Sequence, residues 1–165
     1  MLYSEKMEKR LKKYLKDGKF EGVTATTSKT MSVIRGKNNK TTEMKLKMGL
    51  VRTSISGFIL HDKTLLGKPD FFFKKDRLAI FVDGCYWHGC PKCGHIPKTR
   101  SAFWKAKIDR NIQRDKKNRT SLIKLGIAVL RIWEHELKTS EGINKIIKKV
   151  KSYLTEGEYE KNFQG

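Results

Sequence analysis

The sequence has little cysteine and no long apolar run, and each absence argues against a class of protein. Its three cysteines all lie between Cys85 and Cys93, and an odd, local cluster does not form the disulfide framework of a small secreted protein. No stretch of about 18 apolar residues is present, as a membrane-spanning helix would need. The opening residues MLYSEKMEKR lack the apolar segment of a signal peptide. We therefore expect a cytoplasmic protein.

Acidic residues are scarce as well. The 165 residues include 37 lysines and arginines against 17 aspartates and glutamates, which gives a formal net charge of +20. Solubility does not require so large an excess, so a polyanionic partner is the simplest explanation. Nucleic acid is the first expectation. An anionic membrane surface is the alternative, but the basic residues are spread along the chain without one broad amphipathic helix.

No internal repeat is visible, and the chain has the length of one domain with a hydrophobic core. Residues 4–18 carry apolar side chains at helical spacing, which predicts a short amphipathic helix ending near Gly18. Residues 21–42 are rich in Thr, Ser, Gly, Asn and Lys and indicate a linker or basic arm. We expect an N-terminal helix and linker, a main domain and a C-terminal tail, at residues 1–27, 28–155 and 156–165.

The main domain alternates helical and extended patterns. A helix beginning at Thr41 or Thr42 is followed by an extended segment over SISGFILHD, and two apolar runs around the turn KKDR predict a β-hairpin. A long helix follows from Ser101 to a stop at Gly126, then a buried strand in IAVLRIWE and a last helix over 140–154. This order predicts an α/β fold with a central mixed sheet flanked by helices.

The predicted hairpin brings two carboxylates to one face of the sheet. With the turn at KKDR, Asp70 lies opposite Phe81, and because side chains alternate along a strand, Asp83 points to the same face one diagonal step away. Two carboxylates from adjacent strands could bind a hard divalent cation. Asp70 and Asp83 are therefore candidate metal ligands.

Two further acidic residues can each be interpreted either as functional or as purely structural. Asp115 falls on the core-facing stripe of the long helix, where a buried carboxylate needs a partner. A salt bridge with a nearby arginine explains this position as well as a catalytic role does. Glu43 lies close to the start of its helix, where it could act as a capping or dipole-matching residue.

The cysteines have the spacing of a metal site. Three soft ligands come from Cys85, Cys90 and Cys93, whereas tetrahedral zinc needs four. The fourth ligand could be any of three histidines: His88, His95 and His135. His135 follows the buried strand and could close the site from a distance, which would leave His88 free for acid–base chemistry. Three small buried thiols are the alternative.

Five ordered blocks of sequence, RGKNNKTTE, GKPDF, FVDGCYWHGC, PKTRSAFWKAKIDRNIQRD and LRIWEHEL, together resemble the very short patch repair (Vsr) family of DNA mismatch endonucleases. The resemblance runs from about Ser28 to Leu137. It implies a restriction-endonuclease-like fold, catalytic Mg²⁺ and a structural Zn²⁺. It also implies nicking of one DNA strand 5′ to the thymine of a T:G mismatch, which arises when 5-methylcytosine is deaminated.

The resemblance also assigns roles to individual residues. Asp70 matches the metal-binding aspartate, with a further metal contact from the main-chain carbonyl of Val82. His88 matches the catalytic histidine, which would act as general base, and Glu43 the glutamate that supports it through a hydrogen bond to the imidazole. Asp115 matches a further acid, which would bind metal-coordinated water or orient a neighbour. Asp83 stands where the best-known member has a histidine, so its ligand role follows from the hairpin alone.

The zinc positions of the family map to Cys85, Cys90, Cys93 and His135. The chain departs from the best-known pattern, with Cys90 in place of a histidine and His135 in place of a cysteine. Its third cysteine is also shifted by about one residue. The number of ligands is nevertheless kept.

For DNA contacts, the resemblance implies an aromatic wedge of three residues: Tyr86, Trp87 and Trp104. Core packing is the alternative for these side chains, and Trp133 in the predicted strand is better interpreted as core. Between Lys98 and Arg119 there are nine basic residues against two acids, a pattern suited to phosphate contacts but also to an ordinary solvated face. The candidate phosphate ligands are Arg100, Arg110 and Arg114.

The predicted partner is double-stranded DNA containing a T:G mismatch, with mismatch-repair proteins as a further possibility. Nicking of a single strand suggests a monomer. Two alternatives remain at this level: a Vsr-like restriction-type endonuclease that cuts an undamaged duplex, and a zinc-stabilised DNA-binding module without catalysis. The joint presence of Asp70, His88, Glu43 and Asp115 argues against the second.

Overall fold

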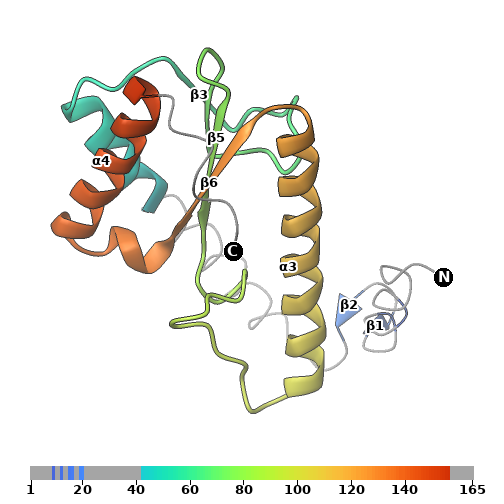
Figure 1. Ribbon diagram of the computed structural model, residues 1–165. Coiled ribbons are helices and arrows are strands. Elements are labelled where there is room, and N and C mark those ends of the chain that lie inside the picture. Colours follow the sequence, from blue (N-terminus) through green and yellow to red (C-terminus); the bar gives the residue numbers. More distant parts are fainter. Residues whose placement is uncertain (1–8, 10–11, 13–14, 17–18, 21–41, 157–165) are drawn as a thin grey trace.

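The computed structural model describes residues 9, 12, 15–16, 19–20 and 42–156 (Figure 1). The predicted linker and most of the C-terminal tail lie outside these residues. Strand β1 (Leu15–Lys16) pairs antiparallel with β2 (Lys19–Phe20), so the predicted helix over 4–18 is wrong at its C-terminal end. An Asp-Gly pair separates the two strands in the sequence. Such a pair favours a hairpin connection, and this signal outweighs the helical spacing.

The main domain is built on a four-stranded mixed sheet in the order β3-β4-β5-β6. Its strands are β3 (Phe58–Leu60), β4 (Phe71–Phe73), β5 (Leu78–Asp83) and β6 (Ala128–Trp133). The first two pairings are antiparallel and the β5–β6 pairing is parallel. Parallel neighbours need a long crossover, which helix α3 (Ser101–Lys124) provides. The predicted α/β fold is confirmed at this level.

Helices cover both faces of the sheet (Figure 1). On one face, the helix at 42–52 and α4 (Ser140–Glu156) pack against the larger core cluster, to which β4 contributes Phe71 and Phe73. On the other face, α3 contributes Leu122 to a smaller cluster around Phe72. The side chains of β4 alternate between the two clusters because successive residues of a strand point to opposite faces.

The hairpin register is as predicted. Phe73 pairs with Leu78 and Phe71 with Ile80, so the turn spans 74–77 and Asp70 continues the ladder opposite Phe81. The long helix also ends as predicted, since Gly126 has a φ of 69°, a left-handed conformation that glycine adopts readily after a helix.

The structure corrects the prediction made for Trp133. It was predicted to lie in the core, but it is only half-buried, and the Arg131 guanidinium lies 5.1 Å from its ring centre. Trp133, the last residue of β6, lies outside the apolar layer, and its ring packs against a charged side chain.

The predicted boundary at residue 155 falls within α4, which continues to Glu156.

Among the described residues, no helix has both the length and the apolar character needed to cross a membrane.

The helix at 42–52 offers a direct test of the larger core cluster. Leu46 is fully buried in that cluster, whereas Met44 on the same helix is 54% exposed. Leu46→Ala is expected to lower the free energy of unfolding by about 2–4 kcal/mol, since it leaves a cavity. Met44→Ala should change it by less than about 0.5 kcal/mol. Urea unfolding followed by circular dichroism measures both, and equal losses would contradict this packing.

Candidate functional site

Three groups of side chains that could bind a metal ion lie near the C-terminal end of β5. In each group, one ligand atom per residue lies within 4.8 Å of the others. The groups are Cys85, Cys90, Cys93 and His135; Glu43, His61 and Asp70; and Asp83, His88 and Asp115.

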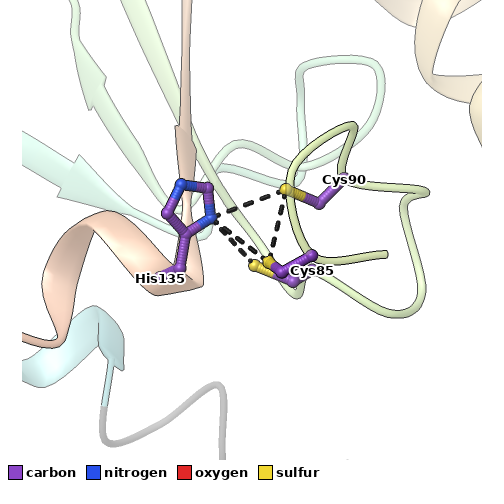
Figure 2. Close-up of side chains that lie close together, drawn as sticks. Cys85, Cys90 and His135 are labelled. Atoms are coloured by element: carbon purple, nitrogen blue, oxygen red, sulfur yellow. Dashed lines mark hydrogen bonds between the residues drawn. The ribbon is translucent and has the colours of Figure 1, made fainter. Parts of the chain in front are cut away.

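The first group joins the loop after β5 to the short helix η1 (Glu134–Leu137) after β6 (Figure 2). The two strands are parallel and in register to their ends, where Asp83 pairs with Trp133. Residues that follow them therefore meet at one edge of the sheet. His135 Nδ1 lies 3.3 Å from the Sγ of Cys85, and 3.5 Å from both other cysteine sulfurs.

These distances fit a tetrahedral metal site. Zn–S bonds of about 2.3 Å and Zn–N bonds of about 2.0–2.1 Å place neighbouring ligands roughly 3.5–3.8 Å apart. Without a cation, burial raises the pKa of the Cys85 thiol to about 12, and a bound cation would reverse this by stabilising thiolates. The group can hold a zinc ion. His135 completes it, while His88 lies in a different group.

The second group surrounds Asp70, which immediately precedes β4. The backbone N–H of Val82 donates a hydrogen bond of 2.6 Å to its carboxylate. Glu43 reaches this point from the helix at 42–52 and His61 from the end of β3. Burial raises the pKa of Asp70 to about 7, against the Val82 hydrogen bond, and the negative charge of Glu43 adds to the shift.

No lysine or arginine among the described residues forms an ion pair with Asp70, whose ion-pair partner is His61 at 3.7 Å. The negative charge of Glu43 disfavours ionisation of Asp70 at this partly buried position. Oxygen donors of this kind suit a hard divalent cation. The donor set therefore fits Mg²⁺ at Asp70.

In the third group, both carboxylates already have a fixed positive charge beside them, the guanidinium of Arg131. His88 Nδ1 lies 2.5 Å from Asp115 Oδ2 and 3.3 Å from Asp83 Oδ1. Arg131 donates to Asp115 at 2.9 Å and to Asp83 through Nε. Burial alone would raise the pKa of Asp115. The hydrogen bond and charge of His88, together with the charge of Arg131, outweigh burial and hold this pKa below its usual value. Asp115 therefore stays ionised.

Three sequence expectations need correction here. Asp70 and Asp83 do not meet, although the register is right. Asp70 lies before the regular strand and turns its carboxylate to the Val82 N–H, while Asp83 binds Arg131. The carboxylates next to Nδ1 of His88 are those of Asp115 and Asp83, and not that of Glu43 as expected. The salt-bridge interpretation of Asp115 holds, because it pairs with Arg131, and it also contacts His88; its catalytic role stays a prediction.

His61 was missed by the sequence reasoning. The signal that could have found it is register, because Leu60 pairs with Phe71 and the next pair outward is His61 with Asp70. The segment containing His61 was identified only as extended, without a pairing partner.

The predicted aromatic wedge forms one half-buried cluster near this site. The ring centres of Tyr86 and Trp87 are 4.9 Å apart, and that of Trp104 lies 5.7 Å and 5.9 Å from them. Lys107 Nζ lies 5.2 Å from the Trp87 ring centre and 5.3 Å from that of Trp104. Partly exposed rings beside a cation suit contact with nucleic-acid bases.

The predicted phosphate ligands Arg100, Arg110 and Arg114 are all exposed, at the start of α3 and along it. A pocket of about 400 Å³ between α3 and the sheet has His88 and Asp115 in its wall. The charge of the long helix is thus available to an anionic partner beside the third group.

Comparison with known proteins gives consistent matches. The family model described as DNA mismatch endonuclease Vsr matches residues 22–93. The type II nicking enzyme V.NmeAIP of Neisseria meningitidis serogroup A / serotype 4A (strain DSM 15465 / Z2491) is 39% identical over 136 residues, covering 76% of this chain and 94% of that protein. DNA mismatch endonuclease Vsr of Escherichia coli (strain K12) is 36% identical over 119 residues, covering 71% and 74%.

The raised pKa of Asp70 leads to a prediction about metal-free stability. Because the folded protein holds a proton on Asp70 up to about pH 7 and the unfolded chain only to about 3.8, this group lowers stability as pH rises between those values. Asp70→Asn should therefore raise the free energy of unfolding relative to the wild type. The gain should be larger at pH 8 than at pH 5 by on the order of 2 kcal/mol.

Urea unfolding in magnesium-free buffer at the two pH values measures this gain. Asp76→Asn, in the exposed hairpin turn, is the matched control and should give no such difference. A gain for Asp70→Asn that is equal at both pH values would contradict the assigned burial.

Proposed function

Because this protein belongs to the Vsr family of DNA mismatch endonucleases, we propose that it nicks one strand of duplex DNA 5′ to the thymine of a T:G mismatch. The reaction is Mg²⁺-dependent hydrolysis of a phosphodiester bond. The mismatch is the product of 5-methylcytosine deamination. The four-stranded mixed sheet with helices on both faces fits a restriction-endonuclease-like fold.

The observation that carries the proposal is the pairing of His88 with Asp115, which lies in the wall of an open pocket. An imidazole whose Nδ1–H donates to an ionised carboxylate keeps its Nε2 lone pair available. Nε2 of His88 is then the atom that accepts a proton from the attacking water. Arg131 holds Asp115 in place and balances its charge.

Asp70 and the main-chain carbonyl of Val82 are the residues proposed to hold Mg²⁺, and Glu43 lies close to Asp70. When bound, Mg²⁺ neutralises charge on the phosphoryl oxygens of the scissile group. Asp83 takes a different role from the one expected from the hairpin. It is a second carboxylate beside His88 Nδ1, fixed by Arg131.

The cysteine group is proposed to hold a structural Zn²⁺ that fixes the loop carrying the chemistry. Trp87 and His88 both lie between Cys85 and Cys90, and the loop closes through the hydrogen bond from Cys90 N–H to the Cys85 carbonyl. A metal that binds both cysteines would therefore limit the positions of the general base and the aromatic wedge together.

For DNA binding, we assign Tyr86, Trp87 and Trp104 to the opening of the base stack at the mismatch. Phosphate contacts are assigned to the exposed arginines Arg100, Arg110 and Arg114. A second candidate function is nicking of a specific undamaged duplex. The name type II nicking enzyme of the Neisseria meningitidis relative is the observation that keeps this candidate open.

The catalytic proposal is tested with end-labelled duplexes that differ only in a T:G, T:A or C:G pair, incubated with Mg²⁺. The wild type should nick the T:G duplex alone, on the thymine strand. His88→Ala should lose about 100-fold or more in rate because the general base is gone, and Asp115→Asn about 10-fold or more because the imidazole loses its orienting partner. Denaturing gels with single-turnover rates give these values.

Asp76→Asn, in the exposed hairpin turn, is the control and should retain full activity. Nicking of all three duplexes would favour the second candidate function. Full activity of His88→Ala would remove the assigned general base.

Zinc removal has its own test. Cys85→Ser should abolish the one equivalent of zinc measured by mass spectrometry and lower the unfolding midpoint by on the order of 10 °C. His95→Ala should keep both the zinc and the midpoint. Stoichiometric zinc in Cys85→Ser would show that this group is not the zinc site.

A further inference from the structure

His61 is held by the backbone at a fixed place opposite Asp70. It continues the β3–β4 ladder beyond the Leu60–Phe71 pair, and its N–H donates 3.2 Å to the Asp70 carbonyl oxygen. Its φ is 51°, a conformation that is uncommon for a residue with a side chain and is often found at functional sites. The following turn is fixed by Asp62, whose Oδ1 accepts hydrogen bonds from the Thr64 N–H and hydroxyl.

This backbone places the imidazole between two carboxylates. His61 Nε2 lies 3.4 Å from Glu43 and Nδ1 lies 3.7 Å from Asp70. Both distances exceed those of ordinary hydrogen bonds, about 2.7–3.2 Å. A cation binds only one of the two ring nitrogens, and one His61 nitrogen, one Glu43 oxygen and one Asp70 oxygen lie within 4.8 Å of one another. This is close to the roughly 4.2 Å between opposite ligands of an octahedral site with bonds of about 2.1 Å.

The charge pattern separates this group from the one around His88. Asp83 and Asp115 already share the guanidinium of Arg131, whereas Asp70 has no such partner among the described residues. The His61 side chain is 57% exposed, so one side of the group stays open to water or a DNA phosphate. The arrangement is that of a partly assembled cation site with one nitrogen and two carboxylate donors.

We propose that His61 is a third side-chain ligand of the cation held at Asp70, and that its imidazole favours first-row transition dications such as Mn²⁺ over Mg²⁺. Mg²⁺ selects oxygen ligands, while imidazole contributes to binding of transition metals. The proposal rests on the proposed function only in taking Asp70 as the cation-binding residue.

The test uses the zinc-loaded full chain with Mn²⁺ as a spectroscopic probe. Pulsed electron paramagnetic resonance should detect ¹⁴N coupling to bound Mn²⁺ in the wild type, and this coupling should be absent in His61→Gln. The variant should lose Mn²⁺ affinity by about 10-fold and Mg²⁺ affinity by no more than about 2-fold, because glutamine replaces the nitrogen ligand with an oxygen ligand. His95→Gln should behave as the wild type.

Asp70→Ala distinguishes failure of this proposal from failure of the proposed function. If Mn²⁺ binding is unchanged in Asp70→Ala, Asp70 is not the cation-binding residue and both fail. If Asp70→Ala abolishes binding, a wild-type spectrum without ¹⁴N coupling overturns the role of His61 alone. Coupling or Mn²⁺ affinity that is unchanged in His61→Gln overturns it as well.

Discussion

The parallel pairing of β5 with β6 is the contact on which the candidate site depends. It runs in register to the last residue of both strands, so the residues that leave each strand emerge side by side. Cys85 follows β5 and His135 follows β6, and their side chains therefore meet at this edge of the sheet. The same pairing sets Arg131 beside the strand that carries Asp83. Since α3 is the crossover between the strands, it brings Asp115 to the same place.

Charge balance then divides the acids into two kinds. One arginine serves both Asp83 and Asp115, and Asp115, whose pKa is lowered, can hold a histidine in a fixed orientation. Asp70 has a hydrogen bond from the backbone but no basic partner beyond His61 among the described residues, and its pKa is raised. A group that could bind an added cation therefore lies close to a group that already has Arg131, and proton transfer and charge neutralisation can be assigned to different residues.

Much of this arrangement follows from sequence because its signals are local. The hairpin register comes from two apolar runs around a short charged turn, and the end of α3 from a glycine. The position of His135 was also within reach, because it required only that two strand ends meet. The errors arose where a side chain left the regular pattern. Asp70 lies outside the strand whose alternation was applied to it, and Trp133 leaves the core to pack against Arg131.

The pairing of His88 with Asp115 instead of Glu43 shows a further limit of sequence reasoning. Glu43 and Asp115 come from helices on opposite faces of the sheet, and residue spacing does not tell which of them reaches a loop at the sheet edge. Packing of that loop decides the question. A Cβ at Gly89 would lie 2.6 Å from the Ile112 side chain, and Asn111 donates 2.9 Å to the Trp87 carbonyl. The loop is thus held against α3, the helix that carries Asp115. Its cysteines contact His135 of η1, which follows β6, so the position of His88 is fixed from two sides by contacts far apart in the sequence.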